Sequence, residues 1–187
     1  MSRAEKRVKD PVLPEHKASV TDTSERFYTE HAADVLRWVI RLGGPHVHAE
    51  DVAQDVFAVA LRRLPSFRGD SSERTWLFAI TRNVVRNAQR RSALRRFVGL
   101  DAIPEPMSPS PPLSAQLDSS RRRQAVQRAL SRLKTHQREA LVLVDMEGLT
   151  AREAGEMLGV PEGTVSSRLH HSRKAFAVAL KREGIDE

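Results

Sequence analysis

The fold of this chain is decided by residues 150–176, which read TAREAGEMLGVPEGTVSSRLHHSRKAF. Thr150 and Glu153 have the spacing of a capping box, in which each side chain bonds the other residue's backbone N–H and so starts a helix. We expect that helix to end at Gly159, and a short turn at Pro161 to lead into a longer helix. The stretch therefore predicts a helix-turn-helix.

The second helix of this motif presents hydrogen-bond donors and acceptors and no large apolar groups on its exposed side. It carries almost no negative charge after Glu162. An α-helix fits the major groove of DNA, and its N-terminal half usually meets the base edges. The alternative is an ordinary pair of packed helices with a solvated basic face. We expect DNA contacts from Thr164, Ser166, Ser167, Arg168, His170, His171, Arg173 and Lys174.

A second basic segment, RTWLFAITRNVVRNAQRR, occupies residues 74–91. Its arginines recur at every fourth position and so lie along one helix face, where like charges repel each other at a cost that a bound polyanion relieves. Arginine holds phosphates, and asparagine pairs with base edges. The segment therefore predicts nucleic-acid binding, with a solvated face as the alternative. The polar residues concerned are Arg82, Asn83, Arg86, Asn87 and Arg90.

An acidic patch precedes this segment. Asp51, Gln54 and Asp55 fall on the outer face of an otherwise apolar helix that we expect over residues 49–64. Beside so many arginines these carboxylates would repel DNA, so they predict a protein partner. The alternative is ordinary solvation, with first-turn acidic residues favoured by the helix dipole.

The bulk composition narrows the class of protein. The chain has 187 residues, a formal net charge of +7 and no cysteine. A basic balance suits polyanions such as nucleic acid or an acidic membrane surface. No stretch approaches the ~20 uninterrupted apolar residues of a membrane span, and the polar N-terminus does not resemble a secretory signal. Disulfides and thiolate metal sites are excluded.

Patterns that would indicate catalysis or a bound metal are weak. The one metal-like cluster is His46-Val47-His48 with Glu50 and Asp51, and we interpret it as a polar turn between helices because it lies in a Gly/Pro loop. A phosphate loop, a nucleophile elbow and a zinc-protease motif are all missing from the sequence. We therefore expect neither an enzyme nor a bound metal or cofactor.

Helical periodicity on both sides of a proline-rich stretch predicts an all-α fold, with two small helical domains joined by a flexible linker. A first helix is expected from near Ser24 to Leu42, with an inward stripe of Phe27, His31, Val35, Leu36, Val39 and Ile40. A later helix is expected to be capped by Ser72 or Ser71. The expected divisions are a flexible arm (1–23), a helical domain (24–97), a Pro/Ser-rich linker (98–117) and a helix-turn-helix domain (118–183).

Several of these segments resemble a known family. EDVAQDVF at 50–57, FRGD at 67–70 and RTWLFAITRN at 74–83 are similar to the second conserved region of bacterial extracytoplasmic-function (ECF) sigma factors. Five further segments resemble the fourth region of that family: QREAL at 137–141, GLT at 148–150, Glu153-Ala154, LGVP at 158–161 and GTVSSRL at 163–169. The resemblance covers about residues 24–92 and 118–181. It departs from the family at His170 and His171, where an arginine or aromatic residue is expected.

The resemblance implies a sigma factor that joins core RNA polymerase and directs it to promoters. Asp51, Gln54 and Asp55 would face the clamp helices of the polymerase's largest subunit, and the fourth region would contact the flap of the second subunit. The fourth region would also bind the minus-thirty-five element through the helix surface described above. The opened minus-ten element would be handled by Phe67, Arg68, Asp70, Ser71, Asn83, Arg86, Asn87 and Arg90.

The resemblance also implies a cytoplasmic bacterial protein with no small-molecule substrate. Most relatives are restrained by an anti-sigma factor, often at the membrane, and the linker would thread toward the polymerase active-site cleft. The competing interpretation is a stand-alone helix-turn-helix regulator that binds DNA as a dimer. That interpretation leaves residues 24–92 without a role, and the sequence predicts no dimerisation helix.

Overall fold

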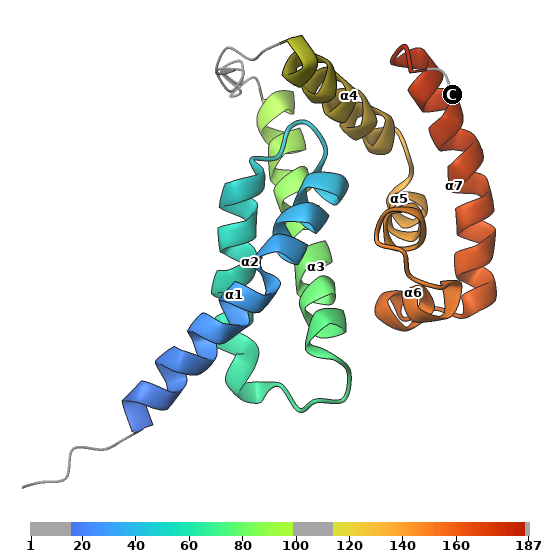
Figure 1. The fold of residues 1–187 in the computed structure, drawn as a ribbon. Helices are drawn as coiled ribbons and strands as arrows, with labels where there is room; N and C mark the ends of the chain where they lie inside the picture. Colours follow the sequence, from blue (N-terminus) through green and yellow to red (C-terminus); the bar gives the residue numbers. More distant parts are fainter. Residues whose placement is uncertain (1–15, 99–113, 186–187) are drawn as a thin grey trace, which may run out of the picture.

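The computed structural model describes residues 16–98 and 114–185, so most of the predicted arm and linker lies outside the described residues. The regular elements of the described part are all helical and it contains no strand, which confirms the all-α prediction (Figure 1). Its elements are α1 (His16–Gly43), α2 (Ala49–Arg63), the 3-10 turn η1 (Leu64–Ser66), α3 (Glu73–Phe97), α4 (Ser114–Ser131), α5 (Thr135–Leu141), the π-helical turn η2 (Val142–Met146), α6 (Ala151–Leu158) and α7 (Glu162–Arg182).

Helices α1, α2 and α3 pack against one another and form an N-terminal unit. Trp38 of α1 is fully buried and meets Phe78 of α3 edge to face, with ring centroids 5.0 Å apart. Phe27 lies at the other end of the same core, beside Phe57 and Trp76. Aromatic burial of this kind stabilises a small helical core strongly for its size.

The buried face of α1 differs from the expected stripe. Leu36 and Ile40, predicted to point inward, are each 36% exposed, whereas Trp38 and Leu42 are buried. The core face continues from Phe27 at steps of three and four residues, and Leu36 and Ile40 lie one position beside it. The helix is apolar on two faces, so its periodicity alone did not select the correct one.

Two helices begin earlier than the sequence predicted. Helix α1 starts at His16 rather than near Ser24, and α4 starts at Ser114, inside the segment assigned to the linker. Neither added stretch contains proline or glycine, the residues that interrupt helices most strongly. The helices therefore extend past the predicted boundaries at 23 and 117, which stay predictions for the functional division of the chain.

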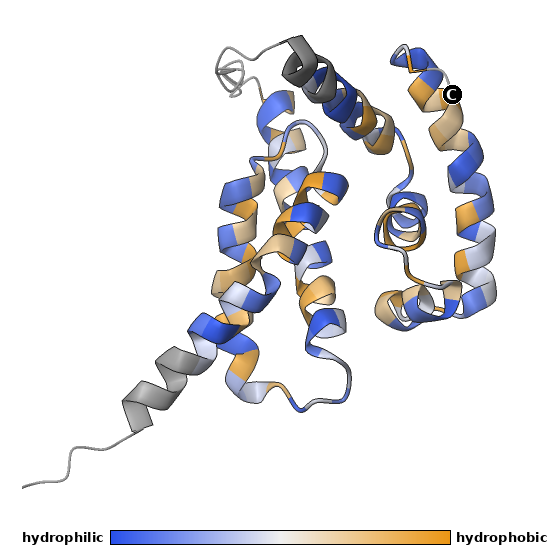
Figure 2. Ribbon diagram, in the orientation of Figure 1, coloured by the Kyte–Doolittle hydropathy of each residue, from blue (hydrophilic) through white to orange (hydrophobic). Residues whose placement is uncertain are grey.

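Helices α4 to α7 form a C-terminal unit, in which α7 packs along α5 and also contacts α4 and α6. Its core contains Leu130, Leu141, Leu143, Val165 and Leu169. Figure 2 shows hydrophilic and hydrophobic residues interleaved along the helices, as expected for helices with one buried face. The two units touch: α4 and α5 contact α1, and α6 contacts α3 (Figure 1).

Candidate nucleic-acid and polymerase interfaces

The predicted capping box is present at the start of α6. The hydroxyl of Thr150 accepts the backbone N–H of Glu153 at 3.2 Å, and the Glu153 carboxylate accepts the backbone N–H of Thr150 at 2.8 Å. These hydrogen bonds, led by the backbone N–H of Thr150, lower the pKa of Glu153. The cap fixes where the first helix of the helix-turn-helix begins.

Two glycines set the turn that follows. Gly159 ends α6 in the left-handed region, at a φ of 67° that favours glycine. Gly155 is buried where the backbone crosses itself, and a Cβ added there would lie only 2.8 Å from the carbonyl oxygen of Val160. The same crossing is closed by a hydrogen bond of 3.0 Å from the Val160 N–H to the Gly155 carbonyl. The sequence predicted the role of Gly159 but not that of Gly155.

Helix α7 buries Val165, Leu169, Ser172 and Ala179 and exposes most of its other polar residues. Thr164 and Arg168 are half-buried. The other predicted DNA contacts are exposed, namely Ser166, Ser167, His170, His171, Arg173 and Lys174. Arg173 donates two hydrogen bonds, of 2.9 and 2.6 Å, to Asp145, which raise the pKa of its guanidinium. The predicted set therefore shares one helix, and one of its cations is already paired.

A groove of about 500 Å³ runs between α7 and the α4–α5 corner. His171 and Lys174, predicted to contact DNA, also form part of its wall. Val178 contributes an apolar side chain that is 53% exposed. The remaining lining residues are Arg132, Leu133, Gln137, Ala175, Ala179 and Arg182.

The loop before α3 brings together an aromatic pair and several exposed polar residues. Phe67 lies against Trp76, with ring centroids 5.0 Å apart and planes tilted by 40°. Ser72 caps α3 by accepting the N–H of Thr75 at 3.1 Å, which confirms one of the two predicted caps. Arg68, Asp70 and Ser71 are exposed on this loop. A flat aromatic face beside polar groups is the kind of surface on which an unstacked base can lie.

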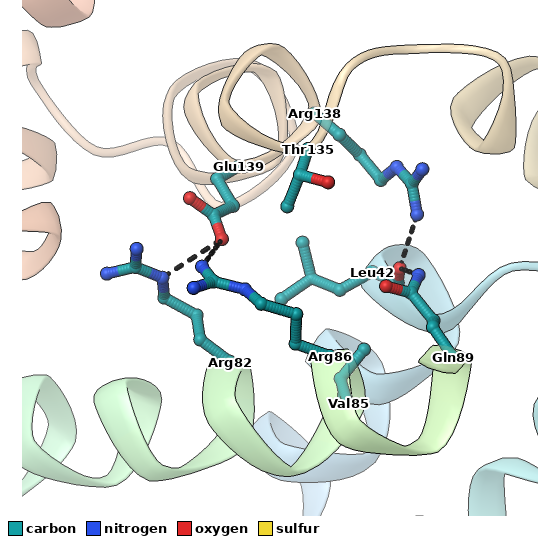
Figure 3. Close-up of a pocket in the computed structure, with 8 residues that line it drawn as sticks. All are labelled: Leu42, Arg82, Val85, Arg86, Gln89, Thr135, Arg138 and Glu139. Carbon is teal, nitrogen blue, oxygen red and sulfur yellow. Dashed lines mark hydrogen bonds and ion pairs between the residues drawn. The ribbon is translucent and has the colours of Figure 1, made fainter. Parts of the chain in front are cut away.

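The polar residues of α3 are divided between two directions. Asn83, Asn87 and Arg90 are exposed. Arg82 and Arg86 instead point toward α5, where both donate hydrogen bonds to Glu139, at 3.0 and 3.1 Å (Figure 3). The repulsion between these arginines is thus offset within the chain by a carboxylate.

A second carboxylate of the C-terminal unit is held in the same way. Glu147 accepts hydrogen bonds from Arg74, at 3.0 Å, and from Arg41, which also donates to the carbonyl of Met146 at 3.2 Å. Arg37 lies 3.6 Å away from the same carboxylate. The side chains of Glu139 and Glu147 are only 5% and 3% exposed.

Arg138 completes this contact from the other side. Its guanidinium is buried and donates a hydrogen bond to the carbonyl of Leu42, at the end of α1 (Figure 3). It also donates hydrogen bonds to the carbonyls of Ser131 and Leu133. Burial lowers the pKa of Arg138. We call the whole contact between the two units the arginine seam; it consists of Arg37, Arg41, Leu42, Arg74, Arg82, Arg86, Arg138, Glu139 and Glu147.

Asp34 supports the seam from within the N-terminal unit. It accepts a hydrogen bond of 3.0 Å from Arg74 and is paired with Arg37. Burial opposes ionisation of this carboxyl, but the hydrogen bonds and positive charges of Arg74 and Arg37 prevail and lower its pKa. Arg74 also lies over the ring of Trp38, 5.4 Å from its centroid. Asp34 and Trp38 of the N-terminal unit thus help to position Arg74, and Asp34 also pairs with Arg37.

The acidic residues of α2 are exposed along one face, as the sequence predicted. Asp51 and Gln54 lie open to solvent, and Asp55 pairs with Arg91 at 3.4 Å. Both members of that ion pair are more than half exposed, so the pair contributes little to stability. The face remains available to a partner.

One group of potential metal-ligand side chains gathers among the described residues, and it differs from the His46 to Asp51 cluster that the sequence analysis interpreted as a polar turn. Atoms of Glu30, His31 and Glu73 lie within 4.8 Å of one another. Arg26 already forms ion pairs with Glu30, at 3.3 Å, and with Glu73, at 3.9 Å. The positive charge of Arg26 therefore balances these carboxylates, and we interpret the group as an ion-pair cluster.

Comparison with known families accounts for both units. The family model described as "Sigma-70 region 2" matches residues 27–95, and the one described as "Sigma-70, region 4" matches residues 123–176. Together they span well over half of the chain.

The chain belongs to the sigma-70 family.

Curated relatives place it in the ECF branch of that family. The ECF RNA polymerase sigma factor SigL of Mycobacterium tuberculosis is 32% identical over 163 residues, which cover 84% of this chain and 89% of SigL. SigM of the same organism is 32% identical over 169 residues, 90% of this chain and 83% of SigM. The protein is thus an ECF sigma factor and directs promoter-specific transcription.

Solved structures agree with this placement. The sigma factor RpoE in complex with the anti-sigma factor NepR, from Bartonella quintana, has a TM-score of 0.61 at 25% identity, over 84% of this chain and 96% of that one. CnrH in complex with the cytosolic domain of CnrY has a TM-score of 0.62 at 24% identity, over 88% and 94% of the two chains, and shows a shared fold. The N-terminal unit is hereafter region 2, and the C-terminal unit region 4.

The family match also decides between the two interpretations of the sequence. A stand-alone helix-turn-helix regulator leaves residues 27–95 without a role, whereas region 2 accounts for them. None of the described helices of this sigma factor is long and apolar enough to cross a membrane.

Sequence reasoning missed the acidic half of the arginine seam. Glu139 and Glu147 stand in an apolar stretch without a periodic charge pattern. A signal was nevertheless present, because Glu139 precedes the buried Val142 and Leu143 by three and four positions and so shares their helix face. A carboxylate on a buried face requires a cationic partner.

Proposed function

We propose that this sigma factor binds core RNA polymerase through the acidic face of α2, handles the melted minus-ten element with the loop before α3 and part of α3, and reads the minus-thirty-five element with α7. One observation carries the proposal: a capped helix-turn-helix is joined in one chain to a region 2 that has an exposed acidic face and, separately, a half-buried aromatic pair beside exposed polar residues. Each surface suits a different partner.

The polymerase contact is assigned to Asp51, Gln54 and Asp55. They share an exposed face of α2, and their negative charge disfavours DNA while suiting a basic protein surface. The family resemblance identifies that surface as the clamp helices of the largest polymerase subunit. Region 4 is assigned the flap of the second subunit.

The minus-ten contact is assigned to the loop residues and to the exposed side of α3. Phe67 on Trp76 offers a stacking surface for an unpaired base, and Asn83, Asn87 and Arg90 lie open on the following helix. Extruding a base from the stack costs a few kcal/mol, which stacking and hydrogen bonds in a pocket offset. Arg86 belongs to the same assignment but is bound to Glu139 in this arrangement.

The minus-thirty-five contact is assigned to the exposed polar residues of α7. Arg168 is half-buried, while Ser166, Ser167 and His170 are exposed on the same helix. Bidentate arginine contacts to guanine are the commonest specific contacts in the major groove. Arg173 and Lys174 suit phosphate contacts, for which Arg173 must first leave Asp145.

The functional division of the chain is proposed as region 2 over residues 24–97 and region 4 over 118–183, with the linker between them leading toward the polymerase active-site cleft. The family matches at 27–95 and 123–176 lie inside these limits. The sigma factor supplies recognition and no catalysis of its own, and it works in the bacterial cytoplasm without a small-molecule substrate.

An anti-sigma factor is the proposed restraining partner. RpoE, which shares this fold, was solved with an anti-sigma factor bound. The groove between α7 and the α4–α5 corner, with exposed Val178 in its wall, is the proposed contact for side chains of such a partner, because it combines apolar and basic residues. A membrane-bound anti-sigma factor would hold the protein at the membrane.

The assignment is tested by separating polymerase binding from promoter binding. Reversing Asp51 and Asp55 to Lys should reduce co-purification with core polymerase at least about tenfold, because like charges then face each other. The charge-matched control changes Glu25 and Glu156 to Lys, two exposed acidic residues elsewhere, and should leave co-purification unchanged. Normal co-purification of the α2 variant would contradict the assignment.

Arg168→Ala should do the opposite. It should lower promoter-specific initiation by about tenfold, the cost of one lost base contact, while core binding stays normal. Arg152→Ala, on the exposed side of α6, is the matched control and should initiate normally. An equal loss of core binding and initiation in Arg168→Ala would show that Arg168 does not act on DNA.

A further inference from the structure

In the arginine seam, two carboxylates of region 4 form ion pairs with arginines of region 2. Glu139 and Glu147 have almost no exposure to water, and their cationic partners Arg82, Arg86, Arg41 and Arg74 all belong to region 2. A buried carboxylate without a partner is strongly unfavourable. The two carboxylates are therefore adapted to a state in which the two regions are docked.

The chemistry of the seam also makes it reversible. The attraction within a buried ion pair largely offsets the cost of removing both charges from water, so such a pair holds weakly in net terms. Among the described residues, the Nε atoms of Arg86 and Arg138 are buried without a hydrogen-bond partner, a cost that separation of the regions removes. The regions share one chain, which keeps a weak contact populated through a high effective concentration.

The seam occupies groups that the proposed function needs. Arg86 belongs to the proposed minus-ten surface, and Arg82 lies one turn before it on the same face of α3. Both arginines share a single oxygen of Glu139. A nucleic-acid backbone offers anionic oxygens at every nucleotide, and arginine binds phosphate in the same way as it binds carboxylate.

We propose that the arginine seam is an autoinhibitory contact: in the free sigma factor, Glu139 of region 4 occupies Arg82 and Arg86, and the DNA backbone replaces Glu139 when the regions separate on polymerase. This inference rests on the proposed role of α3 in binding melted DNA. The exposed Asn83, Asn87 and Arg90 remain open beside the seam and permit a first encounter before the exchange.

The separation is measured by energy transfer between two dyes in the full-length chain. The sequence contains no cysteine, so Thr29→Cys on α1 and Lys181→Cys on α7, both exposed, give unique labelling sites in the two regions. The seam variant combines Glu139→Gln and Glu147→Gln. The matched control combines Glu50→Gln and Glu156→Gln, which make the same charge change at exposed positions.

Without polymerase, the seam variant should show a low-transfer population about tenfold larger than the unmodified chain and the control, since each glutamine removes a carboxylate that holds arginines of region 2. Its affinity for a labelled single-stranded oligonucleotide should rise by about fivefold over the control as Arg82 and Arg86 become free. Identical transfer distributions in the seam variant and the control would overturn the inference.

A second measurement covers the case in which the seam variant does not fold. Adding a saturating single-stranded oligonucleotide to the unmodified chain should move it toward lower transfer, because phosphate oxygens then replace Glu139 on Arg82 and Arg86. A distribution that the bound oligonucleotide leaves unchanged would overturn the inference. Binding of core polymerase by the unlabelled proteins is measured in parallel; its loss in every version would refute the proposed function and leave the seam result standing on its own.

Discussion

The Nε atom of Arg82 lies 3.0 Å from Oε1 of Glu139, although 57 positions separate the two residues and they belong to different conserved regions. Arg86 reaches the same oxygen from one turn further along α3. The basic face that the sequence assigns to nucleic acid is therefore engaged by a carboxylate of its own chain. In this basic protein, Glu139 therefore occupies arginines that are predicted to bind DNA phosphates.

The capping box predicts the stability of region 4. Thr150→Ala removes the hydroxyl that accepts the Glu153 N–H and should lower the free energy of unfolding of region 4 by about 1 kcal/mol. Denaturant unfolding followed by circular dichroism measures the change. Thr29→Ala, at an exposed position inside α1, should cost far less, and equal effects of the two substitutions would contradict the role of the cap.

The turn of the helix-turn-helix depends on Gly155. Gly155→Ala should destabilise region 4 by more than about 1 kcal/mol, because the new Cβ would lie 2.8 Å from the Val160 carbonyl oxygen and the backbone would have to move. Gly163→Ala, where a Cβ meets nothing within 4 Å, should be neutral or stabilise by up to about 1 kcal/mol. Thermal unfolding compares the stabilities of the two variants. Equal stabilities would contradict a tight approach of the backbone at Gly155 and Val160.

The aromatic pair at the loop before α3 predicts an effect on strand opening. Phe67→Ala should reduce promoter melting on polymerase by about tenfold, the loss of one base-stacking surface. Phe97→Ala removes an exposed ring at the far end of α3 and should leave melting unchanged. Reactivity of unpaired thymines in the minus-ten element reports the result, and equal melting by both variants would exclude Phe67 from the minus-ten contact.

Asp34 predicts a dependence of stability on pH. Its pKa is lowered from 3.8 in the folded protein, so its contribution to stability is complete above that value and is lost as the pH falls through the folded pKa. Asp34→Asn should therefore be less stable than the unmodified chain at neutral pH, and the difference should shrink below about pH 4. A difference that stays constant under acid would show that the charge of Asp34 has no part in it.

The local patterns of the helix-turn-helix were predictable, because a capping box and a C-terminal glycine act within a few residues. Thr150, Glu153 and Gly159 lie where the sequence placed them. Gly155 was not recognised, since its constraint comes from the path of the backbone five residues later. The buried face of α1 was partly mistaken, because Leu36 and Ile40 compete with Trp38 for the same periodic pattern.

Contacts between distant segments were beyond local reasoning. The spacing of Arg82 and Arg86 predicted a shared face and an anionic partner, and the partner within the chain is Glu139. Nothing in the spacing distinguishes a carboxylate on another helix from a phosphate, because arginine binds both with similar geometry. The roles of the exposed residues of α2, α3 and α7 stay predictions until the variants are measured.

Run-off transcription with purified core polymerase on a library of promoter fragments measures whether this chain directs polymerase to promoters. Core polymerase alone should give no defined products, and addition of this sigma factor should produce discrete transcripts from a subset of fragments that share paired minus-thirty-five and minus-ten elements. Tight, sequence-specific binding of the isolated chain to duplex DNA, with no transcripts when core polymerase is present, would contradict the account.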